Sequence, residues 1–275
     1  MRPLSSENLW RIIGISAVLS TLLLLAGFGF AVKDMLYPKG EVFEGRANVP
    51  ALPAGGKLSE GKDIAITAIG DSLTKGTGDA SGEGYVKQVV ALLKQKYPDT
   101  SVRLNNNLAV NGLKADRLEQ LLETDKGYSF ALRQANVIVF TIGGNDLFQI
   151  ASGTSPVKAA GELNLNKLKA ELPKDLKRLA HVLKRLHAIN PNVQVVYVGL
   201  YNPFYDIPEY RGGSLQIQQW NERAYALLHQ YPNMTMVPTF DLFENAIGRY
   251  LSSDHFHPNH DGYAQIAARI VQSLE

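Results

Sequence analysis

The sequence predicts an α/β protein: a parallel sheet covered by helices on both faces, preceded by one N-terminal transmembrane helix. From residue 63 onward, short and continuously apolar runs alternate with longer stretches in which apolar residues recur every three or four positions. The first pattern is typical of buried parallel strands, and the second of one buried helix face. Strand–helix alternation favours a parallel sheet because helices make the crossovers between parallel strands. Ahead of this region lies a long stretch without any charged residue.

The composition limits what such a chain can be. Of its 275 residues, 45% are hydrophobic and 20% are charged, which supplies enough apolar residues for a sizeable core and excludes disorder as the main state. At about 150 residues per domain, the length allows one large domain or two small ones. The absence of cysteine excludes a disulfide scaffold and any cysteine-ligated metal centre. A net charge of +2 without a dense basic stripe argues against a nucleic-acid partner.

The first element is the predicted membrane anchor at 12–32. Ile12 to Val32 form a run of 21 residues without a charge, which as a helix spans about 30 Å, the thickness of the hydrocarbon core of a bilayer. A cleaved signal peptide is the alternative, but its apolar stretch is only about 7–15 residues long. The end of this run, GFGFAVKD, also lacks an Ala-x-Ala cleavage site. We therefore expect an uncleaved single-pass anchor, with secretion after cleavage as the alternative.

The charges beside the anchor predict its orientation. Arg2, Arg11 and the amino terminus precede it, and Lys33 and Lys39 follow it. Positive charge collects on the inner side of a membrane, so this weak bias favours a cytoplasmic segment at 1–11. The rest of the chain is then expected outside the cytoplasm, attached to the cell membrane. The absence of cysteine fits that location.

A linker is predicted at 33–61, because Gly and Pro recur there without any sustained period. A single domain at 62–275 follows it. Pro173 is expected in the first turn of its helix, where the missing N–H costs nothing, and Asn259 or Asp261 is expected to cap the last helix. The predicted strands are 63–69, 101–110, 136–142, 193–199 and 234–237. The predicted helices lie near 83–97, 114–123, 174–189, 214–230 and 260–274.

The first candidate site is the tetrapeptide GDSL at 70–73, directly after the first predicted strand. Reactive groups gather at the carboxyl ends of the strands in such sheets. A serine that leaves the sheet here on a tight turn exposes its hydroxyl, so Ser72 is a candidate nucleophile that requires a nearby base. The alternative is that Asp71 or Ser72 only caps the following segment.

Two glycine-containing turns follow the second and third predicted strands. In Asn-Gly at 111–112, Gly112 lets its backbone N–H approach a ligand, although Asn-Gly is also an ordinary turn signal. In GGND at 143–146, Asn145 can aim a side-chain N–H into the same crevice. Donors of this kind stabilise the oxyanion of an acyl-transfer intermediate. The alternative for GGND is a glycine-rich turn with a helix cap.

The fourth candidate site is DHFHPNH at 254–260, which contains three of the six histidines. Asp254 and His257 are three residues apart, so the carboxylate can hold one ring nitrogen while the other faces outward as a base. A metal site built from Asp254, His255, His257 and His260 is the alternative, but nothing upstream supplies a matching cluster at a strand end. His255 and His260 are expected at the solvated rim.

With these four blocks in place, the sequence resembles the GDSL-type esterases and lipases, also called SGNH hydrolases. The serine of that family's first block matches Ser72 in GDSL, and the glycine of its second block matches Gly112. The asparagine of its third block matches Asn145 in GGND. The Asp-x-x-His-Pro of its last block matches DHFHP, with Asp254 and His257 in the two reactive positions.

The resemblance covers 63–275 and implies a flavodoxin-like, three-layer α/β/α sandwich with a five-stranded parallel sheet. It also implies hydrolysis of esters or thioesters without a metal or an organic cofactor. Ser72 would be the nucleophile and His257 its base, oriented by Asp254. The oxyanion hole would consist of the backbone N–H groups of Ser72 and Gly112 and the side chain of Asn145.

Two long loops border the predicted site, at 146–166 and 201–213. Their apolar and aromatic residues suit an acyl chain, and their tyrosines suit a sugar equally well. The alternative is that these side chains only pack the loops down. The residues are Leu147, Phe148 and Ile150 on the first loop and Tyr201, Phe204, Tyr205 and Tyr210 on the second.

We therefore expect a membrane-tethered, extracytoplasmic serine hydrolase that cleaves acyl esters, of the lipase, lysophospholipase or esterase type. Its partner would be a small-molecule or lipid ester, and the membrane through the N-terminal helix. The alternative is an esterase or acyltransferase on acetylated cell-envelope glycans. A catalytically silent binding module is a third hypothesis, against which the complete set of site residues argues.

Overall fold

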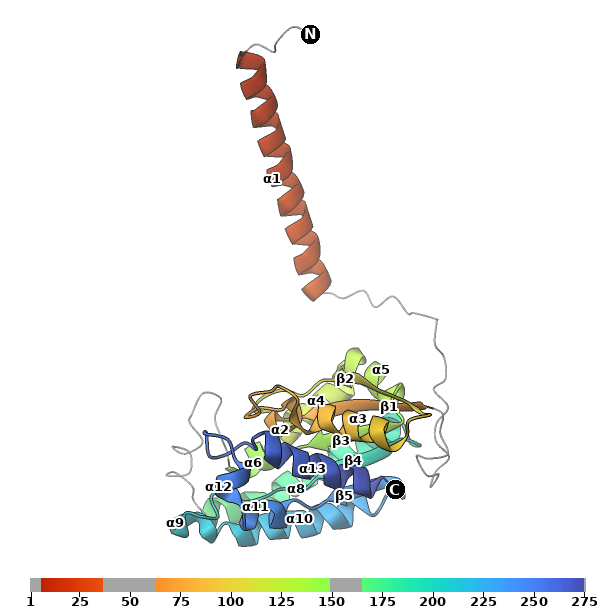
Figure 1. Cartoon of the computed structure of the whole chain (residues 1–275), viewed down its shortest axis with the longest axis vertical. Helices are drawn as coiled ribbons and strands as arrows, with labels where there is room; N and C mark the ends of the chain where they lie inside the picture. The colour runs from red at the N-terminus through yellow and green to blue at the C-terminus, as the bar shows by residue number, and fades with distance from the viewer. Residues whose placement is uncertain (1–5, 37–62, 149–164, 275) are drawn as a thin grey trace. The chain divides into compact units, whose positions relative to one another are not determined.

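The computed structural model describes residues 6–36, 63–148 and 165–274 (Figure 1). The chain divides into two compact units, Met1–Ala47 and Asn48–Glu275. The predicted linker at 33–61 lies almost wholly outside the described residues.

The described part of the first unit is one helix, α1 (Ser6–Leu36), which is 31 residues long. Many of its large apolar side chains are exposed; Trp10, Leu23 and Leu24, for example, are each more than 70% exposed. Within the described residues, no helix is both long enough and apolar enough to cross a membrane. The structure therefore does not support the predicted anchor at 12–32, which stays a prediction.

The second unit is built on a five-stranded sheet with the strand order β2-β1-β3-β4-β5. All four neighbouring pairs are parallel, so the predicted parallel sheet is confirmed. Every predicted strand is present within a few residues of its predicted bounds. The strands are β1 (Asp63–Gly70), β2 (Ser101–Asn107), β3 (Val137–Thr141), β4 (Gln194–Val198) and β5 (Met234–Val237).

Burial along the strands follows their order in the sheet. The central strands β1 and β3 are buried almost throughout, because each has a neighbour on both sides and helices above and below. The edge strand β2 is half-exposed and ends earlier than predicted, at Asn107. The chain nevertheless stays beside β1, since the N–H groups of Leu108 and Val110 donate to Ala68 O and Gly70 O, at 2.8 Å each.

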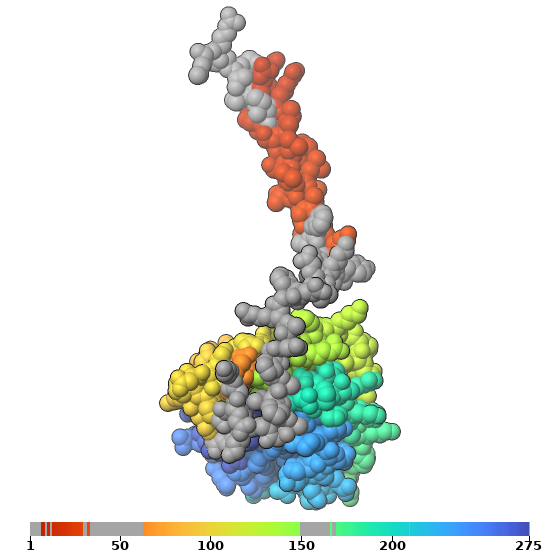
Figure 2. Space-filling view, turned by 90° about the vertical axis from the view of Figure 1, so that its right-hand side faces the viewer, coloured from red at the N-terminus to blue at the C-terminus, as the bar shows by residue number. Residues whose placement is uncertain are grey.

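Helices cover both faces of the sheet, which confirms the predicted three-layer architecture (Figure 1). Figure 2 shows part of the surface of one layer as a succession from α5 (lime) through the end of α8 (teal) to α10 (blue). One face is covered by α3 (Gly84–Lys96) and α13 (His260–Ser273). The other is covered by α4 (Ala115–Thr124), α5 (Lys126–Arg133), α8 (Leu165–Ile189) and α10 (Ser214–Leu228).

The position of Pro173 corrects the prediction. The helix α8 already begins at Leu165, so Pro173 lies inside it and not in its first turn. The residues ahead of the proline also contribute to the core, since Leu172 is buried. Packing of this extra segment compensates for the hydrogen bond that a proline removes from a helix interior. A start signal at a proline is therefore weaker than the apolar pattern that surrounds it.

The start of α13 agrees with its predicted cap. Asn259 is the N-cap residue, and its side-chain oxygen accepts a hydrogen bond from Gly262 N at 2.9 Å. His260 is the first residue of the helix, as expected. The short helices are α2 (Ser72–Lys75), α6 (Gly144–Phe148), α9 (Pro208–Arg211), α11 (Phe240–Glu244) and α12 (Ile247–Tyr250), none of which was predicted.

Candidate active site

The turn between β1 and α2 presents Ser72 at the carboxyl end of the interior strand β1. Gly70 has a φ of +121°, and a Cβ there would lie 2.1 Å from Thr141 O on the neighbouring strand β3. Only glycine tolerates both this backbone conformation and this approach. The next N–H, of Asp71, donates to Thr141 O at 3.2 Å. Gly70 therefore permits the sharp turn, and Ser72 is the first residue of the helix α2 that follows it.

Asp71 stabilises this turn through two hydrogen bonds of its side chain. Its carboxylate caps α2 by accepting a hydrogen bond from Leu73 N at 3.1 Å, and it accepts another from Thr141 Oγ1 at 2.6 Å. Burial raises the pKa of Asp71 more than these hydrogen bonds lower it. The capping alternative is therefore correct for Asp71, and it is compatible with a reactive Ser72 beside it.

Ser72, His257 and Asp254 form a continuous hydrogen-bonded chain. The hydroxyl of Ser72 lies 2.8 Å from His257 Nε2, and His257 Nδ1 lies 2.6 Å from Asp254 Oδ2. The carboxylate accepts a hydrogen bond from Nδ1–H, which leaves Nε2 as an acceptor facing the serine hydroxyl. This is the arrangement in which a histidine activates a serine and is itself oriented by an acid. The structure thus brings together the three residues predicted from the first and last blocks.

Asp254 is held as the charged form. Its Oδ1 accepts hydrogen bonds from Ser252 Oγ at 2.7 Å and from the backbone N–H groups of Phe256 and His257 at 3.0 and 2.9 Å. Partial burial by itself would raise the pKa of Asp254, but the hydrogen bonds from His257 and Ser252 outweigh it and hold the pKa well below its ordinary value. Ser252 was missed because no motif in the sequence indicates it.

The loop that carries His257 is supported from behind. Gly78 packs directly against it, since a Cβ at Gly78 would lie 2.7 Å from His257 Cβ and 2.6 Å from Pro258 O. Tyr201 OH donates to Phe256 O at 2.7 Å from the other side. These contacts limit the positions that the imidazole can take.

Two of the three predicted oxyanion donors, Gly112 and Asn145, lie beside the same edge of the sheet as Ser72. Gly112 has a φ of +74° in the turn that follows β2, where Leu113 N donates to Val110 O at 3.2 Å. Asn145, in α6 directly after β3, donates from Nδ2 to Leu113 O at 3.0 Å. An amide nitrogen carries two hydrogens, so a second N–H of Asn145 can serve a ligand. The structure brings Asn145 to the Gly112 turn, and the donor roles stay predictions.

The other two histidines of the last block have separate partners. His255, at a φ of +55°, places its Nε2 3.1 Å from Asp206 Oδ1. His260 is half-exposed, and its Nδ1 lies 3.4 Å from Asp79 Oδ2. Throughout 6–36, 63–148 and 165–274, no three His, Asp or Glu side chains are arranged to hold a metal ion.

Several loop aromatics pack inward. Phe148, Phe204 and Phe256 are buried against one another, with ring centroids 5.7–6.1 Å apart, and the Phe256 ring lies 4.9 Å from that of His257. The packing alternative is therefore correct for Phe148 and Phe204, and also for Leu147 and Tyr201, which are buried.

Tyr205 and Tyr210 are half-buried and also pack against the cores. Ile150 and most of the loop at 146–166 lie outside the described residues.

Comparison with known proteins agrees with this site. Residues 68–265 match the GDSL-like lipase/acylhydrolase family. The chain belongs to this family. A relative in Bacillus subtilis, the uncharacterized protein YpmR, is 32% identical over 77% of this chain and 82% of its own length. The spore germination lipase LipC of Bacillus licheniformis is 25% identical over 75% of this chain and 94% of its own. As a GDSL-like acylhydrolase, the chain is a carboxylic ester hydrolase.

Solved structures share the fold of this GDSL-like hydrolase. The lipase Lip_vut3 from a goat rumen metagenome has a TM-score of 0.65 at 24% identity, covering 77% of this chain and all of its own. The acetylxylan esterase Axe2 of Geobacillus stearothermophilus has a TM-score of 0.54 at 19% identity, covering 82% and 96% of the two chains. At these identities the likeness extends to the fold alone.

Proposed function

We propose that this enzyme cleaves acyl esters through an acyl-enzyme on Ser72. The observation that carries the proposal is the hydrogen-bonded chain from Asp254 through His257 to Ser72, with lengths of 2.6 and 2.8 Å. These hydrogen bonds place the imidazole where it can take the proton of the serine hydroxyl. An isolated serine is a weak nucleophile because it has no such base beside it.

In the first half-reaction, Ser72 Oγ attacks the ester carbonyl and His257 Nε2 takes its proton. The N–H groups of Ser72 and Gly112 and the amide of Asn145 stabilise the oxyanion, and loss of one such donor typically costs about 10²–10³-fold in kcat. His257 then protonates the leaving alcohol as the C–O bond breaks. In the second half-reaction, water attacks the acyl-enzyme with His257 as base, which releases the acid and restores Ser72.

The substrate class that we favour is a lipid or other acyl ester of the lipase and lysophospholipase type. Support comes from the similarity to a spore germination lipase. The test is a series of p-nitrophenyl esters from acetyl to dodecanoyl, with Ser72→Ala as the blank. We expect kcat/KM to rise with chain length. A maximum at acetyl with a steep fall beyond it would contradict the lipase assignment.

An esterase or acyltransferase for acetylated cell-envelope glycans is the second candidate, favoured by the shared fold with acetylxylan esterases. Water and a sugar hydroxyl would then compete for the same acyl-enzyme. Acetate release from an acetylated glycan, measured with and without an added sugar acceptor, separates the two outcomes. Acceptor-dependent transfer identifies a transferase, and acetate release alone identifies an esterase.

Neither candidate requires a metal in this proposal, since the three reactive groups are side chains of the chain itself. Dialysis against EDTA is expected to leave the hydrolysis rate unchanged. Activity that is lost and then restored by zinc or manganese would favour the metal alternative for the histidines at 254–260.

Attachment to the cell membrane, with the hydrolase domain outside the cytoplasm, is also part of the proposal. It rests on the 21 uncharged residues of 12–32 and on the charges that flank them. Protease treatment of intact cells is expected to degrade the domain while a short N-terminal fragment stays protected. Protection of the domain contradicts the orientation, and a mature N-terminus after residue 32 would indicate cleavage and secretion.

The domain at 62–275 is proposed to act without the segment before it. A shortened chain that begins at residue 62 and ends at residue 275 is expected to be soluble and to retain the kcat of the full chain. A truncated chain that is inactive, beside a full chain that works in detergent, would show that the boundary is wrong.

A further inference from the structure

The carboxylate of Asp146 follows Asn145 directly in GGND, yet no reactive role has been given to it. Its side chain has no exposed surface. Both of its oxygens lie 3.1 Å from Ala115 N, which donates its N–H to them. A buried acid in such a position requires a structural or functional reason, because burial of a carboxyl group is costly unless it makes compensating interactions.

The N–H that Asp146 accepts belongs to the first residue of α4. The first N–H groups of a helix have no partner within the helix, and they carry its positive partial charge. The N-cap residue of α4 is Lys114, whose side chain makes no capping hydrogen bond. Asp146 therefore caps α4 from a different segment of the chain.

Asn145 and Asp146 both form hydrogen bonds with the segment that follows Gly112. Asn145 donates to Leu113 O at 3.0 Å, and Asp146 accepts from Ala115 N, two residues further on. Leu113 and Ala115 are both buried. Two adjacent residues of α6 thus hold both ends of the segment that links the Gly112 turn to α4.

We propose that Asp146 is a positioning residue of the oxyanion hole, which keeps the Gly112 N–H and the Asn145 amide at a fixed separation by anchoring the start of α4. The inference rests on the proposed acyl-enzyme function of Ser72. The donors come from two different loops, so their separation depends on a bond between those loops. Oxyanion stabilisation requires donors that are already in place when the charge develops.

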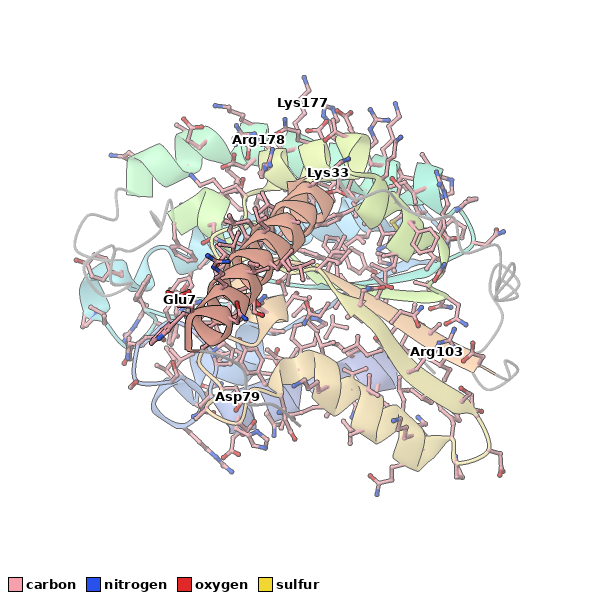
Figure 3. All side chains as sticks on the ribbon, turned by 90° about the horizontal axis from the view of Figure 1, so that it is seen from above. Glu7, Lys33, Asp79, Arg103, Lys177 and Arg178 are labelled. Carbon is pink, nitrogen blue, oxygen red and sulfur yellow. The ribbon has the colours of Figure 1, made fainter. Side chains whose placement is uncertain are left out.

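The charges around Asp146 shift its pKa, but the hydrogen bond to Ala115 does not depend on whether the carboxyl group is ionised. Arg178 on α8 (Figure 3) places Nη1 3.8 Å from Asp146 and 2.9 Å from Asp175, and its Nη2 lies 3.3 Å from Asp116 on α4. Burial raises the pKa of Asp146 to about 7, with Asp175 and Asp116 adding to the rise and Arg178 opposing it. The ionised and the protonated carboxyl group both retain an oxygen that accepts the Ala115 N–H.

The test compares Asp146→Ala with Asp146→Asn and with Asp116→Ala, all in the full chain. Asp146→Ala removes the acceptor, Asp146→Asn keeps one acceptor oxygen, and Asp116→Ala removes a neighbouring carboxylate that does not contact the Gly112 turn. Each variant is measured for kcat and KM on a p-nitrophenyl ester and for Ki of a trifluoromethyl ketone, which forms a tetrahedral oxyanion on the serine.

We expect Asp146→Ala to lower kcat at least tenfold, to raise the Ki of the ketone by a similar factor, and to leave KM within threefold. Asp146→Asn and Asp116→Ala should stay within threefold of the parent in all three values. An Asp146→Ala protein with the parental kcat and Ki would overturn the proposal. An Asp146→Asn protein as impaired as Asp146→Ala would overturn it as well, because the acceptor oxygen would then be irrelevant.

A second variant removes the same hydrogen bond from the donor side. Ala115→Pro deletes the N–H at a position where proline suits a helix, since Lys114 before it is already extended, with φ −106° and ψ 161°. We expect the same changes in kcat and Ki, and no further loss in the double variant with Asp146→Ala. A folded Ala115→Pro protein with parental values overturns the proposal even where Asp146→Ala fails to fold. A parent no more active than Ser72→Ala would instead refute the proposed function.

Discussion

His257 Nε2 lies 2.8 Å from Ser72 Oγ, although 185 residues separate the two along the chain. Ser72 follows the interior strand β1, and His257 belongs to the loop that precedes α13. Both segments meet at one edge of the sheet because α13 packs on the same face as α3, which follows Ser72 closely in the sequence. The contact is thus a product of the packing of the helices on the sheet.

Replacement of either partner of this contact should abolish most of the activity. Ser72→Ala and His257→Ala are each expected to lower kcat by about 10³-fold or more, and the double variant should be no worse because the two residues act as one unit. His255→Ala and His260→Ala are the matched controls, expected within tenfold of the parent. The measurement is the steady-state kcat of each variant on the same p-nitrophenyl ester. An inactive His255→Ala beside an active His257→Ala would mean that the base is misassigned.

Asp254→Asn should have an intermediate kcat, between the parent and Ser72→Ala. The amide keeps the shape of the side chain but can impose the wrong tautomer on His257. The lowered pKa of Asp254 also predicts a loss of stability. Its charged form contributes stability above the ordinary pKa, and this contribution disappears as the pH falls through the lowered value.

Thermal unfolding of Asp254→Asn at pH 7 and pH 3 measures this effect. We expect a lower Tm than that of the parent at pH 7 and a smaller difference at pH 3. An equal difference at both pH values would show that the carboxylate charge does not contribute. Circular dichroism at pH 7 serves as the control that the variant is folded.

Gly78→Ala should impair catalysis from a position outside the reactive residues. The new Cβ would lie 2.7 Å from His257 Cβ, so the histidine loop must move, and a displacement of about 1 Å at a reacting group can cost 10²-fold. Gly82→Ala is the matched control. Gly82 also has a positive φ, of +69°, but open space around its Cβ position, so that variant carries only the backbone cost of about 1–2 kcal/mol.

We expect Gly78→Ala to lose at least tenfold in kcat, with a Tm below that of Gly82→Ala. Gly82→Ala should keep the parental kcat. Equal kcat values for the two folded variants would mean that Gly78 does not restrain His257.

Asp146→Asn should stabilise the protein, and more so at high pH. The pKa of Asp146 is raised in the folded state to about 7, above its ordinary value of 3.8. Folding therefore favours the protonated form, and the contribution of this group to stability is full below pH 4 and is lost as the pH rises through 7. The amide does not ionise, so its Tm advantage over the parent should be larger at pH 8 than at pH 5. Asp116→Asn controls for the loss of one charge beside Arg178; a pH-independent advantage would refute the explanation.

Much of the site was predictable because its signals are local. GDSL, Asn-Gly and GGND each follow a recognisable strand, and a parallel sheet collects such turns at one edge. The Asp-x-x-His spacing of Asp254 and His257 likewise indicates a pair within one turn. By contrast, Asp71 was predicted only as a possible cap, and its bond to Thr141 requires the pairing of β1 with β3.

The sequence by itself determined the alternation of strands and helices and the parallel sheet, and it indicated candidates for the reactive triad, because apolar periodicity and turn chemistry are properties of neighbouring residues. The tertiary structure alone decided what lies across from what. The strand order β2-β1-β3-β4-β5 places α6 beside the start of α4, and only then can Asp146 cap a helix that begins 31 residues earlier in the chain. Likewise, packing on the sheet extends α8 through Pro173, against the local preference of proline for a helix start. Contacts between distant segments depend on the free energy of the whole packed core, which no local pattern records.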